Sequence, residues 1–374
     1  MSLLASVQPF SHTAHIRGVV FSDYPRIAAL TARNGLEMKN REEWEHMWAN
    51  NPVYKRIPDW PMGWVAEVGQ EIVGYCGNIP LSFSYKGQEI IGQAPHSLCL
   101  DPPHRGHMVL FAKRCLRYRK GVEYSVDSSA NASSFKLLDA LKVPRVPVGD
   151  WANSVFWIID HAGFLASALE RKRWPKFLAY PGAALLKGRD RLTKPSAWRR
   201  RANEVAPCET FDERFAAFWD ELQQAYPNRF LSNRSREVLL WHFHFALKKK
   251  RIWIATLGDS SRITAYATFL RVDSPEIKLK RVRLVDFQVL DGNTEALIPL
   301  LAWALEACEK EGIHMLEAYG FRPDKQRVID RIAPHRRQLP AWFYFYKVWN
   351  KEFAQEFRNP DIWDPSHYDG DATL

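Results

Sequence analysis

The chain has 374 residues, which at roughly 100–200 residues per domain predicts two domains. Apolar residues make up 46% and charged residues 25% of the chain, so a disordered, collagen-like or low-complexity protein is excluded. Five cysteines without CxxC spacing predict neither a disulfide framework nor a metal site, and indicate a reducing cytoplasm. The first residues lack a basic stretch followed by a long apolar run, so we expect no signal peptide.

The net charge of +10 is concentrated in one segment. Residues 171–201 hold eleven basic residues and one acidic residue, Asp190. Because the whole chain has 52 basic and 42 acidic residues, the remainder holds 41 of each sign and is neutral. Proteins that wrap nucleic acid usually carry basic groups across whole folded faces. A single basic segment instead indicates a local contact with an acidic surface, and both an anionic membrane and RNA remain open as partners.

An apolar stretch, residues 155–169, directly precedes the basic segment. Its fifteen residues are too few for a transmembrane helix, which needs ~20. One interpretation is an amphipathic element that lies at a membrane surface and is followed by basic anchors. The other is a solvated interdomain linker whose apolar part docks on a domain, as its prolines and glycines indicate.

The part of the chain before the basic segment predicts two helices, an antiparallel meander, a third helix, a strand and a fourth helix. A cap and proline at Ser22–Pro25 begin the first helix, and Gly69 and Gly87 mark turns of the meander. The predicted ranges are helices 25–34 and 41–50, strands 63–68, 71–80, 81–85 and 88–100, helix 108–119, strand 123–127 and a helix from 131.

The same order of elements recurs after the basic segment, without a residue-level repeat. The predicted ranges are helices 211–226 and 235–247, strands 251–257, 264–272 and 281–290, helix 295–311 and strand 313–319. This recurrence indicates a duplicated fold.

The element order resembles the fold of GNAT acyltransferases, and the first half carries a local signature of that family. Residues 98–107, LCLDPPHRGH, resemble the end of the fourth strand and its Arg-Gly turn. Residues 127–131, DSSAN, together with Phe135, Leu138 and Leu141, resemble the fifth strand, its Asn and the next helix. Tandem halves are also similar to Fem-type peptidyl transferases. The resemblance implies an α/β (α+β) protein with two tandem GNAT-like domains, 14–150 and 205–350. Each has a mixed, mainly antiparallel sheet with helices on both faces, and they are joined by a linker, 151–204, and followed by a tail, 351–374.

The resemblance implies acetyl-CoA or another acyl-CoA as co-substrate. Leu98 and Leu100 stand where the family pairs its strand with the pantetheine arm. Arg105, Gly106 and His107 stand where backbone amides meet the diphosphate. Asn131 is a further candidate for cofactor contact, and a helix cap is an equal interpretation of it. The family has glycines where this chain has Met108 and Leu110, whose side chains would crowd the approach of a phosphate.

Candidate catalytic and acceptor residues follow from the expected strands. His96 lies on the same face as Leu98 and is a candidate base, with a buried structural histidine as the alternative. Tyr124 is a candidate acid for the departing thiolate. Asp286 and Glu317, on neighbouring strands of the second half, are candidates for acceptor binding, and an internal hydrogen-bonded pair is the alternative.

The function predicted from these residues is transfer of an acyl group from acyl-CoA to a small amine acceptor. The alternatives are an aminoacyl-tRNA-dependent or lipid-linked transferase of the Fem type, and a non-catalytic binding protein. The expected location is the cytoplasm, at a membrane surface if the basic segment binds lipid.

Overall fold

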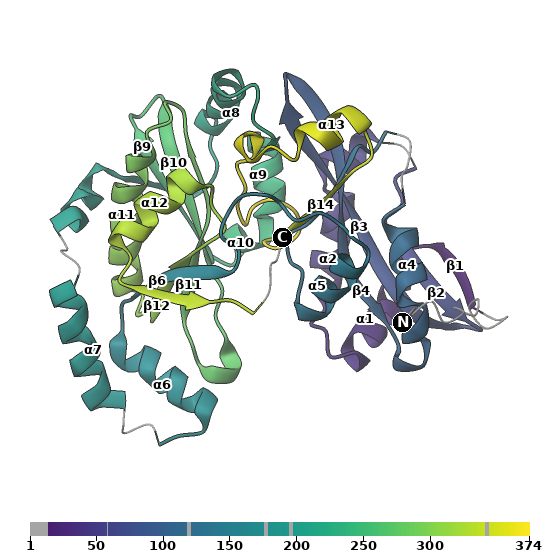
Figure 1. Cartoon of the computed structure of the whole chain (residues 1–374), viewed down its shortest axis with the longest axis horizontal. Coiled ribbons are helices and arrows are strands. Elements are labelled where there is room, and N and C mark those ends of the chain that lie inside the picture. Colours follow the sequence, from purple (N-terminus) through teal and green to yellow (C-terminus); the bar gives the residue numbers. More distant parts are fainter. Residues whose placement is uncertain (1–13, 58, 118–120, 176–178, 194–196, 341–343) are drawn as a thin grey trace.

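The computed structural model describes residues 14–374 except 58, 118–120, 176–178, 194–196 and 341–343. Two sheets lie side by side and helices cover the faces of both (Figure 1). Both are mixed and mainly antiparallel, with a parallel pair of strands in each, as the sequence predicted.

The first sheet has the strand order β1-β2-β3-β4-β5-β14, and β8 pairs with β3 outside this order. Helices α1 and α2 pack on one face through Ile27, Leu30, Trp44 and Trp48. Helix α4 packs on the other face through Phe111. The strands are β1 Ala14–Gly18, β2 Gly63–Val68, β3 Glu71–Tyr85, β4 Gln88–Leu100, β5 Tyr124–Asp127, β8 Leu231–Ser232 and β14 Phe345–Val348, and the helices are α1 Tyr24–Arg33, α2 Arg41–Ala49, α3 Pro52–Arg56, α4 Met108–Cys115 and α5 Ala132–Ala140.

The second sheet has the order β13-β6-β12-β11-β10-β9-β7. Apolar residues of α11 and α12 form one core with the sheet, and residues of α8 and α9 form another. The strands are β6 Asn153–Ile158, β7 Ala206–Cys208, β9 Ile252–Gly258, β10 Ile263–Arg271, β11 Arg281–Val289, β12 Met315–Ala318 and β13 His335–Gln338, and the helices are α6 His161–Lys172, α7 Ala179–Thr193, α8 Arg214–Ala225, α9 Arg236–His242, α10 His244–Lys248, α11 Leu297–Lys310 and α12 Pro323–Ile332. The last helix, α13 Lys351–Glu356, lies against β14 of the first sheet (Figure 1).

Strands cross the predicted domain boundaries. β6, which follows the first half in the chain, pairs with β12 and β13 of the second sheet. β14 and β8, which both belong to the second half, pair with β5 and β3 of the first sheet. The first sheet therefore contains strands of both halves, and the second sheet contains a strand of the segment predicted as a linker. The domain ranges 14–150 and 205–350 stay a prediction.

The structure divides the apolar stretch that precedes the basic segment. Residues 154–158 are buried within β6, in the interior of the second sheet, and the following residues begin α6. The stretch is thus neither one amphipathic element nor one docked linker, because its first half supplies a strand that two neighbours pair with.

The predicted C-terminal tail is an interior segment. Residues 362–371 are all buried, and the C label in Figure 1 lies between the two halves. Trp363 joins an aromatic cluster with Phe230 and Tyr346, which come from the second half, and with Tyr124 of the first sheet. The segment therefore contributes to the packing that joins the halves.

Candidate active site

Strands β4 and β5 diverge and leave one edge of β4 open. The two strands are parallel but pair only at Gly92 with Tyr124 and Gln93 with Ser125. Beyond Gln93, β4 continues to Leu100 with β3 as its partner, and no other described strand pairs with its second edge. An open strand edge offers N–H and C=O groups that an extended ligand can bind.

A bulge in β4 lies beside this opening. His96 pairs with Gly77 and Cys99 with Tyr75, so β4 has one residue more than β3 in this interval. Ser97 lies in the bulge and has a left-handed backbone conformation, with a φ of 54°. Gly77, opposite His96, has no room for a side chain, because a Cβ there would lie 2.7 Å from the hydroxyl oxygen of Tyr75 and 3.3 Å from the Cβ of His96. Bulges bend a strand and redirect its side chains, and here His96 lines the cavity described next.

A cavity of about 210 Å³ lies between the divergent strands. Its walls come from β4, from the segment after β5, from α4 and α5, from the loop after α1 and from the C-terminal segment. The lining residues are Leu36, Glu37, Cys76, Pro95, His96, Ser97, Leu98, Ala112, Cys115, Leu116, Asp127, Ser129, Ala130, Asn131, Ser134, Leu137, Leu138 and Asp371.

Three polar side chains meet in the cavity through Asp371. Its carboxylate lies 2.8 Å from Nδ1 of His96 and accepts a hydrogen bond of 2.8 Å from the hydroxyl of Ser129. An imidazole that donates from Nδ1 to a carboxylate keeps Nε2 as a proton acceptor. Burial, and then the negative charge of Asp371, raise the pKa of Asp127 to about 7. The cavity therefore combines an oriented imidazole with a carboxyl group that titrates near neutral pH.

The Arg-Gly turn lies in a 3-10 helix, Pro102–His107, between β4 and α4. Arg105 and Gly106 are exposed, and a Cβ added at Gly106 would meet no atom within 4 Å. Arg105 donates a hydrogen bond of 3.3 Å to the side-chain oxygen of Asn34. His107 is the N-cap residue of α4. The turn is thus open to solvent at the start of a helix, where an anion is favoured.

The two residues expected to crowd a phosphate do not line the cavity. Met108 packs against the apolar cluster beneath α4, and Leu110 is 39% exposed. Their effect on a diphosphate at the turn stays a prediction.

The other candidate ligands take different positions. Leu98 lines the cavity, whereas Leu100 is buried beneath α4. Asn131 lines the cavity and also caps α5, because its side-chain oxygen accepts from the amides of Ser133 and Ser134. Both interpretations of Asn131 are therefore compatible with its position.

Tyr124 is not among the cavity residues. It is completely buried among aromatic rings, with Phe83 at 4.8 Å and Phe230 at 4.7 Å between ring centroids. Burial raises the pKa of its phenol well above the ordinary value. In this position Tyr124 packs between the halves, and its hydroxyl does not reach the cavity where the departing thiolate was expected.

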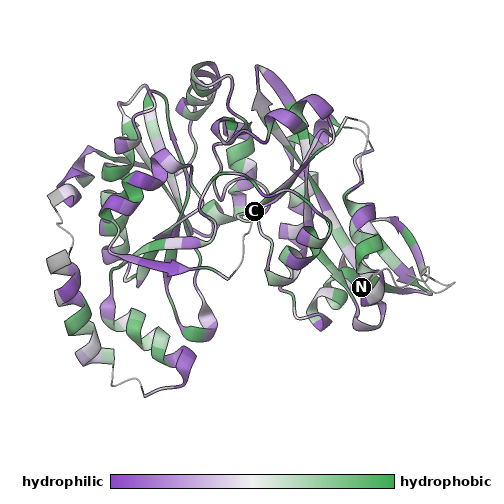
Figure 2. Ribbon diagram, in the orientation of Figure 1, coloured by the Kyte–Doolittle hydropathy of each residue, from purple (hydrophilic) through white to green (hydrophobic). Residues whose placement is uncertain are grey.

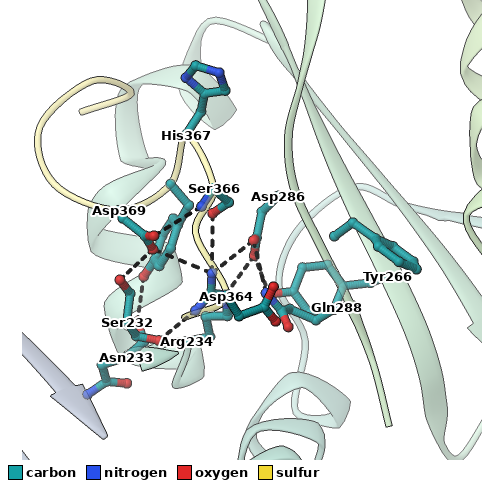
Figure 3. Close-up of polar contacts among 12 residues, drawn as sticks. Ser232, Asn233, Arg234, Tyr266, Asp286, Gln288, Asp364, Ser366, His367 and Asp369 are labelled. Atoms are coloured by element: carbon teal, nitrogen blue, oxygen red, sulfur yellow. Dashed lines mark hydrogen bonds and ion pairs between the residues drawn. The ribbon is translucent and has the colours of Figure 1, made fainter. Parts of the chain in front are cut away.

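Asp286 and Glu317 also lie away from the cavity, inside the second half. Arg234 donates to both oxygens of Asp286 at 2.8 and 2.9 Å, and Tyr266 donates to the same carboxylate at 2.8 Å (Figure 3). Glu317 pairs with Arg283 at 2.8 Å. Both carboxylates have no exposed surface. The expected acceptor contact is therefore replaced by internal ion pairs, each with an arginine and not with one another.

The corresponding opening in the second sheet is filled by the chain itself. Strands β11 and β12 are parallel and pair only at 281–283 with 315–317. Beyond this point Arg234 contacts the hydroxyl of Ser366 at 3.3 Å (Figure 3), and the ring of His367 packs edge-on against Tyr319 at 4.2 Å. Lys325 donates to the carbonyl of Phe287 on β11. Side chains therefore fill the opening between β11 and β12, whereas the corresponding edge of β4 in the first half is open.

The sequence did not reveal Asp371, which is 275 residues from His96 along the chain. No spacing rule connects residues that are so far apart. Asp127 was part of the recognised motif, but its altered pKa depends on burial and on Asp371, and neither could be read from the sequence.

The sequence matches no protein-family model and no curated protein. Among solved structures, N-myristoyltransferase from Saccharomyces cerevisiae with bound myristoyl-CoA and inhibitors is similar, with a TM-score of 0.53 and 11% identity over 92% of this chain and 82% of that one. A GCN5-related N-acetyltransferase from Kribbella flavida has a TM-score of 0.53 and 12% identity over 90% and 72%. One from Anabaena variabilis ATCC 29413 has a TM-score of 0.52 and 10% identity over 90% and 72%.

These similarities cover nearly the whole chain and therefore both halves. None of the three is a Fem-type transferase, so that part of the resemblance stays a prediction. The divergent strands, the bulge and the Arg-Gly turn occur in the half where the signature was recognised. The chain has the GNAT-like fold of the N-myristoyltransferases and GCN5-related N-acetyltransferases.

Proposed function

We propose that the protein is an acyl-CoA-dependent acyltransferase that acylates an amine. The observation that carries the proposal is the open edge of β4, which borders a cavity containing His96 and Asp371. The thioester arm would lie along this edge. The exposed turn at Arg105 and Gly106 would hold the diphosphate, because the amides at the start of α4 and the guanidinium favour negative charge.

His96 is the proposed general base. Nε2 accepts a proton from the acceptor amine as the nitrogen attacks the thioester carbonyl, and Asp371 stabilises the imidazolium that forms. The new C–N bond replaces the C–S bond, and the electron pair leaves with the thiolate. Asp127, with a pKa of about 7, is the proposed acid for this thiolate, in place of Tyr124. No covalent enzyme intermediate is needed, so most of the rate would come from positioning.

The acceptor is proposed to enter between the halves. A second cavity of about 160 Å³ is lined by Lys39, Glu43 and Leu374, among other residues. The loop after α1 and the C-terminal segment contribute to both cavities, since Leu36 and Asp371 line the first and Lys39 and Leu374 the second. An amine held in the second cavity would approach His96 along these two segments.

The location is proposed to be a reducing compartment, the cytoplasm. All five cysteines are free thiols and four of them are buried. No described helix combines the length and the apolar character that crossing a bilayer requires.

Donor binding tests the proposal directly. Acetyl-CoA and longer acyl-CoAs should raise the melting temperature of the full chain, by an amount that grows with concentration. Gly106→Asp should abolish this rise, because it adds a side chain and a negative charge at the turn. Gly18→Asp is the matched control, since a Cβ there also meets no atom within 4 Å. An unchanged melting temperature at millimolar concentrations of every acyl-CoA would exclude the proposal.

A further inference from the structure

The segment between β6 and β7 exposes large apolar side chains. Trp174, Tyr180 and Leu185 are 58%, 73% and 79% exposed. The other large apolar residues that the described chain exposes are Val20, Val109 and Leu110, at 49%, 42% and 39%. The three most exposed residues of this kind thus lie within twelve positions of one another. Exposed apolar residues that cluster in this way indicate an interaction surface, whereas scattered ones do not.

Helix α7 has a packed face. Ala179 and Ala183 are buried, and Gly182 lies close to Leu165 of α6, because a Cβ at Gly182 would be 3.2 Å from its side chain. Asp190 is turned to the same side, where its carboxylate lies 3.0 Å from His161 and 2.8 Å from His335. These contacts fix the orientation of α7 on the second half.

The opposite face of α7 is apolar and flanked by cations. At ~100° per residue, an arc of about 100°, from Ala184 to Leu185, contains only apolar positions, and the positions of Arg191 and Tyr180 lie just beyond its Ala184 edge. Lys187 and Arg189 lie beyond its two edges and are exposed. The arc consists, in order around the helix, of Ala184, Gly188, Pro181, Leu192 and Leu185, of which Ala184, Gly188, Pro181 and Leu185 are exposed, as is Tyr180 beside the arc.

Further cations lie at the end of α6. Arg171, Lys172 and Arg173 are exposed, and the ammonium of Lys172 is 5.5 Å from the centre of the Trp174 ring. The one acidic residue of the basic segment, Asp190, faces His161 and His335 and also lies 3.5 Å from the guanidinium of Arg189, so it offsets part of that one charge. Lys176 and Lys194 lie outside the described residues. In Figure 1 α6 and α7 lie at the edge of the molecule away from the first half, and Figure 2 shows hydrophobic and hydrophilic stretches along both.

We propose that this face of α6 and α7, defined by Trp174, the apolar arc of α7 and the flanking cations, docks on an anionic lipid membrane. An apolar arc bordered by Lys and Arg matches the layering of such a membrane, with acyl chains beneath negatively charged headgroups. Trp and Tyr favour this interface because each has an apolar ring and a polar group. RNA would use the cations but would leave Leu185, Pro181 and Ala184 in water. The proposal is independent of the acyltransferase reaction.

Vesicle sedimentation of the full chain tests the proposal. The protein should sediment with vesicles of phosphatidylcholine and phosphatidylglycerol and remain in solution with vesicles of phosphatidylcholine alone. Tyr180→Ser with Leu185→Ser should weaken the binding at least about tenfold, because the apolar contribution is lost. Lys187→Glu with Arg189→Glu should also weaken it and reduce its dependence on salt.

The matched control removes exposed apolar side chains elsewhere. Val20→Ser with Leu110→Ser should leave vesicle binding unchanged, since both lie on the first half. Circular dichroism and the melting temperature without vesicles would identify any variant that fails to fold. The wild-type comparison of the two vesicle types decides the question even if a variant is lost.

Three results would overturn the proposal. One is the absence of wild-type sedimentation with anionic vesicles. Another is full binding by the Tyr180→Ser, Leu185→Ser variant. The third is RNA binding in a filter assay that decreases steeply with salt and survives the serine substitutions, which would assign the segment to nucleic acid.

Discussion

Asp127 shows how a single group in the cavity connects chemistry with stability. Its pKa in the folded chain is about 7, against an ordinary value of 3.8. Between these values the folded chain keeps a proton that the unfolded chain has released. The protonated carboxyl therefore contributes its full share to the free energy of unfolding below pH 3.8, and this contribution is lost as the pH rises toward 7.

Asp127→Asn should remove this pH dependence. An amide carries no charge, so the variant avoids the cost of a buried carboxylate above neutral pH. We expect its melting temperature to match the wild type near pH 4 and to exceed it by a few degrees near pH 8, measured by scanning calorimetry. Equal differences at both values would show that Asp127 titrates normally.

Asp371→Asn should reduce catalysis without affecting donor binding. The amide can still accept from Nδ1 of His96, but it does not stabilise the imidazolium. We expect kcat/KM to fall by about 10²-fold or more, since general-base catalysis contributes ~10²–10⁴. The rise in melting temperature with acyl-CoA should persist. Ser129→Ala, which removes only the second partner of Asp371, is the milder comparison.

At the scale of the element, the bulge in β4 controls the shape of the site. Ser97 has a φ of 54°, a region that β-branched residues adopt at high cost. Ser97→Val should lower the free energy of unfolding by about 1–2 kcal/mol in urea denaturation, whereas Ser97→Gly should not. The valine variant should also bind acyl-CoA more weakly, because a straightened β4 would lose the opening beside β5. Unchanged stability of the valine variant would show that the bulge is not required.

The elements themselves were largely predictable from the sequence, and their partners were not. The predicted range 281–290 and β11 differ by one residue, because alternating apolar residues and the turn at Gly292 define the strand locally. β3 continues through Pro80 as one strand where the sequence indicated two. Nothing local shows that β14 pairs with β5, since its four residues would fit either sheet edge. Local sequence patterns likewise identified the turn and His96, whereas Asp371 is distant in the sequence and meets His96 only in the folded chain.

At the scale of the whole molecule, strands β8 and β14 of the second half, which pair within the first sheet, and the buried C-terminal segment join the halves into one unit. Lys325 donates to Asp364 of that segment at 2.6 Å, and both side chains are almost completely buried. Burial lowers the pKa of Lys325, and Asp364 opposes that shift. The pair therefore holds the segment against the second half only while both partners are present.

Lys325→Met should destabilise the protein by about 3–5 kcal/mol, because it leaves a buried carboxylate without its cation. Lys325→Met with Asp364→Leu should recover much of this loss.

Thermal unfolding of the wild type should be a single transition, seen alike by calorimetry and by circular dichroism, because the first sheet needs strands β8 and β14 of the second half. Two separate transitions would contradict this view of the molecule.

The position of Asp371 also sets the order in which the site matures during translation. The strand that carries His96 leaves the ribosome 275 residues before the carboxylate that orients it. A nascent chain can thus form β3 and β4 early and still hold an unfinished cavity. The proposed acyl transfer would begin only after synthesis has passed Asp371, and chains that end before that residue would lack this activity however well the first sheet had formed.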